Sequence, residues 1–402
     1  MKHHYKEEEI GDHLNYWLYN TGRVSSTLSV LCSSLLDELI ELELSVERLN
    51  LGVFVMHPEL AGVAYQITPA SRFPTAITIS HASLESEVYL RSPIRKAVEE
   101  RIVQRWKLTP VKALPYPFLE ELRSDGFTDY IVLPLLGTHE RVHVVSIATK
   151  QAGGFRNDVF HALSEFAHPL AMLVDSLTSQ RLSEVLLQLY VGRKTGTRVL
   201  NGEVNLGEGH TIRAALFYSD MRDFSSLCNK VGVLKTIDTL NKYLSIVSTV
   251  IQEEGGEILK FMGDAIMAIF PIDVHVGTND VHQHALDTSA ANACLRAAGR
   301  SLSQIQKWNL ENNETPIRSG FGLTLGDVFY GNIGAPGRLD FTVIGETVNL
   351  AARLEALCKV YESDILIGPN FQNACDTSLK SYGKCEIKGF PEAVAIHGTF
   401  SK

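Results

Sequence analysis

The chain has 402 residues, 45% of them hydrophobic and 21% charged, a composition typical of a globular protein with two or three domains. Its formal net charge of −9 argues against polyanionic partners, so we expect neither nucleic-acid binding nor docking on anionic membranes. No apolar run approaches the roughly 20 residues that span a bilayer. Six cysteines without a C-x-x-C pair favour free thiols and a cytoplasmic protein.

The first part of the chain predicts an α+β domain. After an N-terminal segment of residues 1–24, leucines at helical spacing predict an amphipathic helix over 25–46. Strands are expected at 51–57, 62–67, 76–80, 129–136 and 142–148, and a helix at 93–106. In order and length, residues 25–156 resemble a GAF-type sensor domain.

Residues 157–200 carry apolar side chains at intervals of three or four residues and predict one long helix. The spacing favours a two-stranded coiled coil between protomers. The alternative is that the first part packs on the sensor domain as a terminal helix. Pro169 is expected to kink or break the hydrogen-bond ladder of the helix locally, and Gly192, Gly196 and Gly202 are expected to end the helix. We therefore expect a signalling helix and connector over 157–210.

The remainder, residues 211–402, alternates between strands and helices. A first strand precedes a helix at 233–253, a hairpin, a helix at 284–311, a strand pair at 317–331, a strand and helix at 340–360, and closing strands. Hairpins within such an alternation match a ferredoxin-like, or palm, arrangement of the sheet.

Two aspartates, 44 residues apart, each lie in an apolar strand-like run. Asp220 stands in A-A-L-F-Y-S-D-M-R-D-F, and Asp264 in E-I-L-K-F-M-G-D-A-I-M-A-I-F. A carboxylate among apolar strand residues is costly unless a positive charge lies beside it. Gly263 leaves room for a ligand. The pair therefore suggests divalent cations on a phosphate substrate rather than two turn residues.

Three motifs follow further along the chain: G-F-G-L-T-L-G-D-V-F-Y-G-N-I-G, T-V-I-G-E-T-V-N-L-A-A-R-L-E and a terminal I-K-G-F. Together with the two aspartate segments, they resemble the catalytic domain of class III nucleotidyl cyclases over 205–402. The resemblance implies an adenylyl cyclase. Its substrate would be ATP, and the ribose 3′-oxygen would attack the α-phosphorus to give cyclic AMP and pyrophosphate.

The resemblance also implies a metal site and a phosphate site. Asp220, Asp264 and the carbonyl of Met221 are expected to hold two Mg²⁺ or Mn²⁺ ions per active site, one activating the 3′-hydroxyl and the other binding the triphosphate. Phe224 and Ser225 begin a helix whose free N–H groups are expected to bind the phosphates.

Further residues are implied to contact the nucleotide. Lys260 is expected to donate to the base edge, and the Thr342 hydroxyl to accept from the adenine 6-amino group. This Lys–Thr pairing resembles an ATP-selective subgroup in which bicarbonate stimulation is known. Asn349 and Arg353, four residues apart on one helix face, are expected as a buried pair that orients the ribose and binds phosphate oxygens. Lys388 is expected to bind the terminal phosphates.

Four positions depart from the family pattern. Asp223 replaces a usual glycine, Thr324 a common histidine, and Glu346 a frequent aspartate. Asp327 stands where some family members carry a basic phosphate contact. None of these changes removes a required role, so we expect an active enzyme.

In the family, the metal carboxylates and the Lys–Thr–Asn–Arg set belong to opposite subunits of a head-to-tail dimer. Since this chain carries both sets, a homodimer with two composite sites is expected. The N-terminal sensor would regulate it through a small-molecule or ion effector. The alternatives are a guanylyl or dual-specificity cyclase, against which Lys260 argues, a nucleotide-binding pseudo-cyclase that acts as a regulatory module, and a front half that only dimerises the enzyme.

Overall fold

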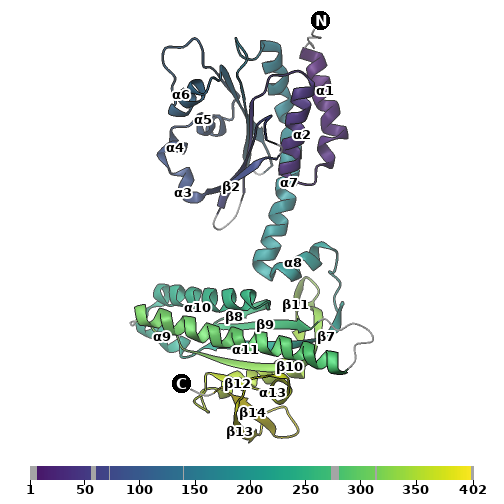
Figure 1. Ribbon diagram of the computed structural model, residues 1–402, viewed down its shortest axis with the longest axis vertical. Helices are drawn as coiled ribbons and strands as arrows, with labels where there is room; N and C mark the ends of the chain where they lie inside the picture. The colour runs from purple at the N-terminus through teal and green to yellow at the C-terminus, as the bar shows by residue number, and fades with distance from the viewer. Residues whose placement is uncertain are drawn as a thin grey trace. The chain divides into compact units, whose positions relative to one another are not determined.

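The computed structural model describes residues 7–55, 60–71, 73–138, 140–272, 280–312 and 315–399 (Figure 1). The chain divides into two compact units, Met1–Leu186 and Leu187–Lys402. Each unit combines one β-sheet with covering helices, so the mixed α/β class expected from the sequence is confirmed. The GAF-like character of the first unit and the coiled coil stay predictions.

An antiparallel sheet in the order β3-β2-β1-β6-β5-β4 forms the centre of the first unit. The strands are β1 (Arg48–Phe54), β2 (Leu60–Ile67), β3 (Thr75–Ser80), β4 (Gln104–Lys107), β5 (Asp129–Leu136) and β6 (Val142–Thr149). Both β5 and β6 are buried over nearly their whole length. Their burial on both faces explains why each is a continuous apolar run in the sequence.

Helices cover both faces of this sheet (Figure 1). One hydrophobic core contains α1 (Glu7–Asn20), α2 (Leu28–Glu41) and α7 (Asn157–Val191). The other face packs against α5 (Pro93–Glu100) and α6 (Pro117–Ser124), with the short η1 (Gly22–Val24), α3 (His81–Leu84) and α4 (Glu87–Leu90) completing the unit. The sequence did not predict α1. The expected helix at 93–106 was too long, because its last residues form β4.

Pro169 lies inside α7 and does not end it, and its expected local effect on the hydrogen-bond ladder stays a prediction. A proline removes one main-chain hydrogen bond, whereas Phe166, Leu170 and Val174 anchor the helix to the core on both sides of that position. Gly192, at φ +88°, ends α7 as expected, whereas Gly196 lies inside the next helix, α8 (Arg193–Leu200), and does not end it. Within the described ranges, no helix has the combined length and apolar character needed to cross a bilayer.

The second unit contains a sheet in the order β13-β14-β12-β10-β7-β9-β8, with β11 paired to β10. Its strands are β7 (Gly209–Met221), β8 (Glu257–Met262), β9 (Ala265–Ile272), β10 (Ser319–Ala335), β11 (Arg338–Ile344), β12 (Ile365–Ile367), β13 (Lys380–Cys385) and β14 (Val394–Gly398). The part β10-β7-β9-β8 places the strands of a βαββαβ unit in the order 4-1-3-2, the ferredoxin-like arrangement. The strand pair expected at 317–331 is a single long strand, β10.

Helices also cover both faces of this second sheet. α10 (Val233–Glu253) and α11 (Asp280–Glu311) share a core with one face, and α12 (Glu346–Leu357) packs on the other. The short helices are α8 (Arg193–Leu200), α9 (Phe224–Val231) and α13 (Pro369–Ala374). On β7, Ser219 faces α10, because Tyr243 donates a hydrogen bond to its hydroxyl at 2.9 Å. The next residue, Asp220, therefore lies on the α12 face.

Candidate active site

The two aspartates singled out in the sequence come together at one end of the second sheet. Asp220 precedes the last residue of β7, and Asp264 lies in the turn between β8 and the neighbouring β9. Gly263, at φ +68°, adopts the left-handed conformation that this turn requires. Burial, followed by the charge of Asp264 and a hydrogen bond with it, raises the pKa of Asp220 to about 6.

Two adjacent, partly buried carboxylates fit a divalent cation. Repulsion between them disfavours the state in which both are ionised, and a bound cation would remove that penalty. Carboxylate oxygens are the donors that Mg²⁺ and Mn²⁺ prefer. The Met221 N–H donates to Asp220 Oδ1 at 2.9 Å and orients that side chain. In the described part of the chain, no group of three or more His, Cys, Asp or Glu could hold a metal ion. We expect main-chain carbonyl groups, phosphate or water as the remaining ligands.

The chain turns from β7 into α9 through Asp223, whose φ of +61° is left-handed. This left-handed conformation explains why a glycine is usual at position 223. Aspartate tolerates the conformation better than most other residues do. Arg318 and Lys359 form ion pairs with the Asp223 carboxylate. Phe224 packs against the core, and the side chain of Ser225 lies outside the described residues. The main-chain N–H groups of this turn would therefore be the groups that bind a phosphate.

Lys260 on β8 and Thr342 on β11 lie beside a third residue, Asp340. The Lys260 ammonium is 2.7 Å from Asp340 Oδ2. Asp340 and Thr342 are two residues apart in one strand, so their side chains share a face. Thr342 is only 4% exposed, and its buried hydroxyl has no hydrogen-bond partner among the described residues. The sequence analysis did not single out Asp340, although its position two residues before Thr342 in an expected strand was visible.

Asn349 and Arg353 are exposed on α12, so the expectation of a buried pair is wrong for the single chain. The helix buries Ala351 and Leu354 against the sheet and the C-terminal strands. Side chains at 349 and 353 consequently point away from the sheet face that carries Asp220. A single chain therefore does not bring the two sets of expected residues together.

Three further expected positions lie apart from the aspartates. Lys388 is exposed in the loop between β13 and β14. Thr324 is buried, and its hydroxyl donates to the carbonyl of Thr347 at 3.0 Å. Asp327 forms an ion pair with Arg213 at 3.3 Å, which explains its acidic character without a phosphate.

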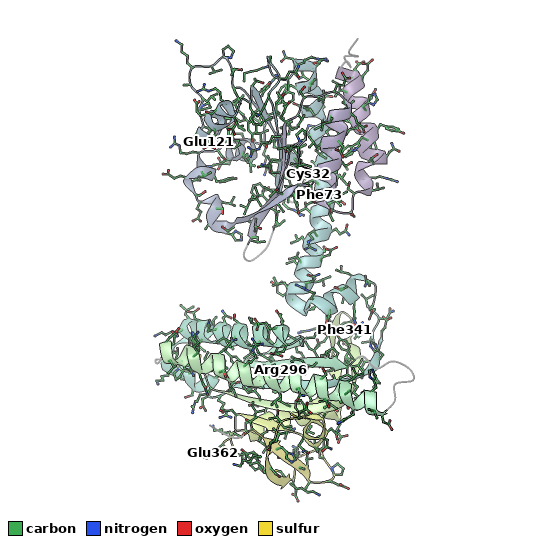
Figure 2. All side chains as sticks on the ribbon, viewed as in Figure 1. Cys32, Phe73, Glu121, Arg296, Phe341 and Glu362 are labelled. Atoms are coloured by element: carbon green, nitrogen blue, oxygen red, sulfur yellow. The ribbon has the colours of Figure 1, made fainter. Side chains whose placement is uncertain are left out.

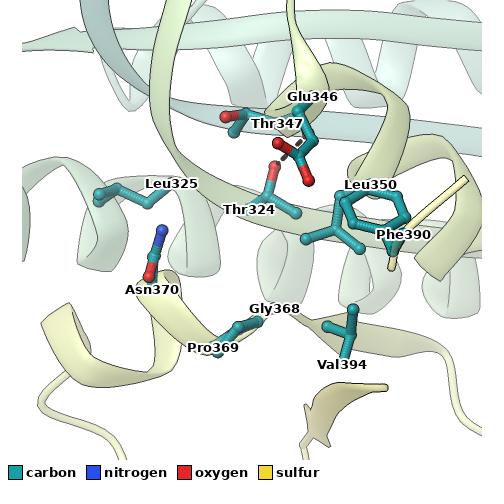
Figure 3. Close-up of a pocket in the computed structure, with 10 residues that line it drawn as sticks. All are labelled: Thr324, Leu325, Glu346, Thr347, Leu350, Gly368, Pro369, Asn370, Phe390 and Val394. Atoms are coloured by element: carbon teal, nitrogen blue, oxygen red, sulfur yellow. Dashed lines mark hydrogen bonds between the residues drawn. The ribbon is translucent and has the colours of Figure 1, made fainter. Parts of the chain in front are cut away.

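A cavity of about 260 Å³ opens beside Thr324 and the N-terminal turn of α12 (Figure 3). Its walls also come from Glu346, Leu350 and Phe390. None of the residues expected to hold the metal or the nucleotide lines it. The cavity is therefore separate from the end of the sheet that carries the two aspartates.

Glu355, which the sequence analysis did not single out, faces the two aspartates. Burial and then the charge of Asp220 raise the pKa of Glu355 to about 7, while Arg222 opposes the rise and Asp264 adds to it. Position 355 shares a helical stripe with the buried Ala351, and this periodicity was the available signal in the sequence.

Helix α8 contacts β8 through the ion pair of Lys194 with Glu257 at 3.7 Å and also contacts β10 and β11. The Arg198 guanidinium lies over the rings of Tyr330 at 4.9 Å and Phe341 at 5.7 Å; Phe341 is labelled in Figure 2. Glu257, at the start of β8, accepts a hydrogen bond from Tyr330 at 2.8 Å. A shift of α8 would therefore act on β8, β10 and β11 together.

Comparison with known families gives one domain match. Residues 209–397 match the family described as "Adenylate and Guanylate cyclase catalytic domain". The chain is 34% identical over 200 residues to "Adenylate cyclase, terminal-differentiation specific" of Dictyostelium discoideum, covering 48% of this chain and 9% of that protein. It is 31% identical over 206 residues to an adenylate cyclase of Anabaena cylindrica, covering 48% of this chain and 38% of that protein. The chain thus spans well under half of either relative.

Solved structures give similar matches. The adenylyl cyclase CyaB from P. aeruginosa is 27% identical, with a TM-score of 0.41, covering 48% of this chain and 97% of that one. A bacterial light-regulated adenylyl cyclase is 20% identical, with a TM-score of 0.47, covering 70% of this chain and 87% of that one.

Proposed function

Because residues 209–397 belong to the adenylate and guanylate cyclase catalytic family, we propose that the protein is an adenylyl cyclase that converts ATP to 3′,5′-cyclic AMP and pyrophosphate. The observation that carries this proposal is the meeting of Asp220 and Asp264 at the end of the ferredoxin-like sheet. Two curated relatives are named adenylate cyclases, which supports ATP as the substrate.

The chain's own groups would position the nucleotide for an intramolecular attack. Asp220 and Asp264 would hold two Mg²⁺ or Mn²⁺ ions, with the Met221 carbonyl as a further ligand. Bound divalent cations would lower the pKa of the ribose 3′-hydroxyl and offset the charge of the triphosphate. The main-chain N–H groups at the start of α9 would donate to the phosphates, since a helix N-terminus favours an anion.

Selection of adenine would depend on Lys260 and Thr342. The ammonium group would donate to a base acceptor, and the hydroxyl would accept from the 6-amino group. The orphan hydroxyl of Thr342 supports this role, because a buried polar group without a partner is costly unless a ligand satisfies it. Asp340 would hold Lys260 in place.

A homodimer would complete the site. Asn349 and Arg353 are exposed in one chain and would reach the aspartates of a second copy in a head-to-tail pair. There, Asn349 would orient the ribose, Arg353 would bind the α-phosphate oxygens and Lys388 the terminal phosphates. Exposed apolar side chains on β8 and β11 support such an interface: Phe261, Met262, Leu339 and Ile344.

Regulation would come from the first unit. Residues 25–156 would form a GAF-like sensor for a small molecule or ion, and residues 157–210 the signalling helix and connector. Leu189 and Tyr190, near the end of α7, are exposed, which supports pairing with the same helix of a second copy. The contacts of α8 with Tyr330 and Phe341 would carry a helix movement to the strands of the purine site.

The direct test is product analysis. Purified full chain is incubated with Mg²⁺ or Mn²⁺ and either ATP or GTP, and the products are separated by liquid chromatography and identified by mass. Cyclic AMP from ATP, with little or no cyclic GMP from GTP, is the expected result. Cyclic GMP as the main product would identify a guanylyl cyclase. A dimer that binds ATP but yields neither product would indicate a pseudo-cyclase.

A further inference from the structure

Glu355 reaches the metal end of the sheet because of the way α12 packs. The helix buries Ala351 and Leu354, followed by Cys358. Position 355 lies four residues after Ala351 and three before Cys358, so it belongs to the same stripe. The Glu355 side chain is therefore directed at the sheet and is partly buried, although glutamate usually lies on the solvent face of a helix.

A glycine on β10 makes room for the carboxylate. A Cβ atom at Gly320 would lie only 2.5 Å from Glu355 Oε1, so any side chain there would displace it. Gly320 is also the direct cross-strand partner of Asp220. Residues opposite each other on an antiparallel pair share a face, with Cβ positions about 4.5–5.5 Å apart. Glu355 thus lies over the strand position next to Asp220.

The charges around Glu355 are unbalanced. Asp220 and Asp264 repel it, and Arg222 attracts it. Arg222 is itself held elsewhere, since its Nη2 donates to the carbonyl of Ser363 at 2.7 Å. Burial and the two aspartates therefore disfavour a charged Glu355 in the metal-free chain, and Arg222 offsets this only in part.

We infer that Glu355 is a positioning residue of the metal site, whose carboxylate adds a third negative charge beside Asp220 and Asp264 and strengthens divalent-cation binding without ligating the ion. Two aspartates carry two negative charges, whereas two divalent cations carry four positive ones. A nearby carboxylate lowers the free energy of the bound cations through Coulomb attraction. The inference rests on the proposed function, because it concerns the cation site of that reaction.

The test is Mn²⁺ binding by the full chain, measured from the electron paramagnetic resonance signal of free Mn²⁺. Titrations are made with the metal alone and with a non-cyclisable ATP analogue. Glu355→Gln keeps the shape of the side chain and removes its charge, and Glu355→Asp keeps the charge. Glu311→Gln is the control, because it removes an exposed carboxylate at the end of α11. Asp264→Asn tests the metal site itself.

We expect Glu355→Gln to raise the Kd for Mn²⁺ on the order of fivefold. Glu355→Asp should recover most of this loss, and Glu311→Gln should match the unmodified chain.

Different results would contradict the role of Glu355 and the metal site of the proposed function. If Asp264→Asn abolishes Mn²⁺ binding while Glu355→Gln binds as tightly as the unmodified chain, the role of Glu355 is wrong and the metal site stands. If Asp264→Asn binds Mn²⁺ normally, the metal site of the proposed function is wrong. If circular dichroism shows that Glu355→Gln does not fold, Glu355→Asp becomes the test. A loss of Mn²⁺ binding in Glu355→Asp as large as in Asp264→Asn would overturn the inference, because Glu355→Asp retains the negative charge.

Discussion

Lys260 and Asp340 form an ion pair, with Nζ and Oδ2 2.7 Å apart, between β8 and β11. Both side chains are partly exposed, at 29% and 54%. Such a pair contributes at most about 1 kcal/mol to stability. Its significance is positional, because it fixes the ammonium group beside Thr342, where we propose that the purine binds.

Asp340→Asn should therefore weaken the selection of ATP over GTP. The amide keeps the size of the side chain but no longer restrains the ammonium by charge. We expect the ratio of kcat/KM for ATP and GTP to fall about tenfold, or ~1.4 kcal/mol. Asp327→Asn is the matched control, since Asp327 is also an exposed acidic partner of a basic residue, Arg213. An unchanged ratio in Asp340→Asn would mean that the ion pair has no part in base selection.

Thr342→Val should separate stability from substrate recognition. The substitution preserves shape and removes a buried hydroxyl that lacks a partner. We expect the second unit to gain about 1 kcal/mol in its free energy of unfolding. KM for ATP should rise several-fold. Thr324→Val provides the contrast, because its buried hydroxyl donates to the Thr347 carbonyl and its loss should destabilise the unit. Denaturant unfolding and steady-state kinetics measure both effects.

If Thr342→Val lowers stability as Thr324→Val does, the hydroxyl has a partner in solution. If stability rises but KM for ATP stays constant, the hydroxyl does not contact the base. Either result would remove Thr342 from the purine site.

The metal-free protein should lose stability as the pH rises from 5 to 8. The pKa of Asp220 is raised to about 6 and that of Glu355 to about 7, from ordinary values of 3.8 and 4.5. A carboxyl with a raised pKa in the folded state binds its proton more tightly there than in the unfolded chain. The stability gained from this tighter proton binding is fully present below the ordinary pKa and is lost as the pH rises through the raised pKa.

Thermal unfolding with a chelator, at pH 5 and pH 8, measures this loss. Mn²⁺ added at pH 8 should restore the transition, because a cation replaces the protons. Asp264→Asn should reduce the pH dependence without removing it, because burial is the largest cause of both raised pKa values. The difference between the variant and the unmodified chain separates the site from titrating groups elsewhere. Burial lowers the pKa of His143, for example, so below its ordinary pKa of 6.5 this group makes the stability rise with pH. A transition in the unmodified chain that is independent of pH and of Mn²⁺ would contradict the charge model of the site.

The strand-end positions of Asp220 and Asp264 could be predicted from the sequence because the signals are local. Asp220 and Asp264 each interrupt an apolar run, and Gly263 marks the turn. The helix predicted at 233–253 has the bounds of α10, since its apolar residues repeat regularly. These features depend on neighbours within a few positions of the chain.

Features that depend on distant partners were not predictable. Asp340 is explained only by Lys260, 80 residues earlier. The exposure of Arg353 follows from which face of α12 meets β10, and apolar neighbours in the sequence suggested the reverse. In each case, tertiary packing decides the role of the residue.

We propose that exposed α12 residues of one chain complete the aspartate site of another. Mixing Asp264→Ala protein with Arg353→Ala protein tests it most directly, with cyclic AMP as the readout. Each variant alone should lose at least about 10²-fold in kcat. In an equal mixture, mixed dimers carry one site with both residues intact, so activity should return to about a quarter of the unmodified level if subunits exchange freely. Gel filtration and exchange of labelled subunits verify that mixed dimers form. Mixed dimers without recovered activity would contradict the shared site.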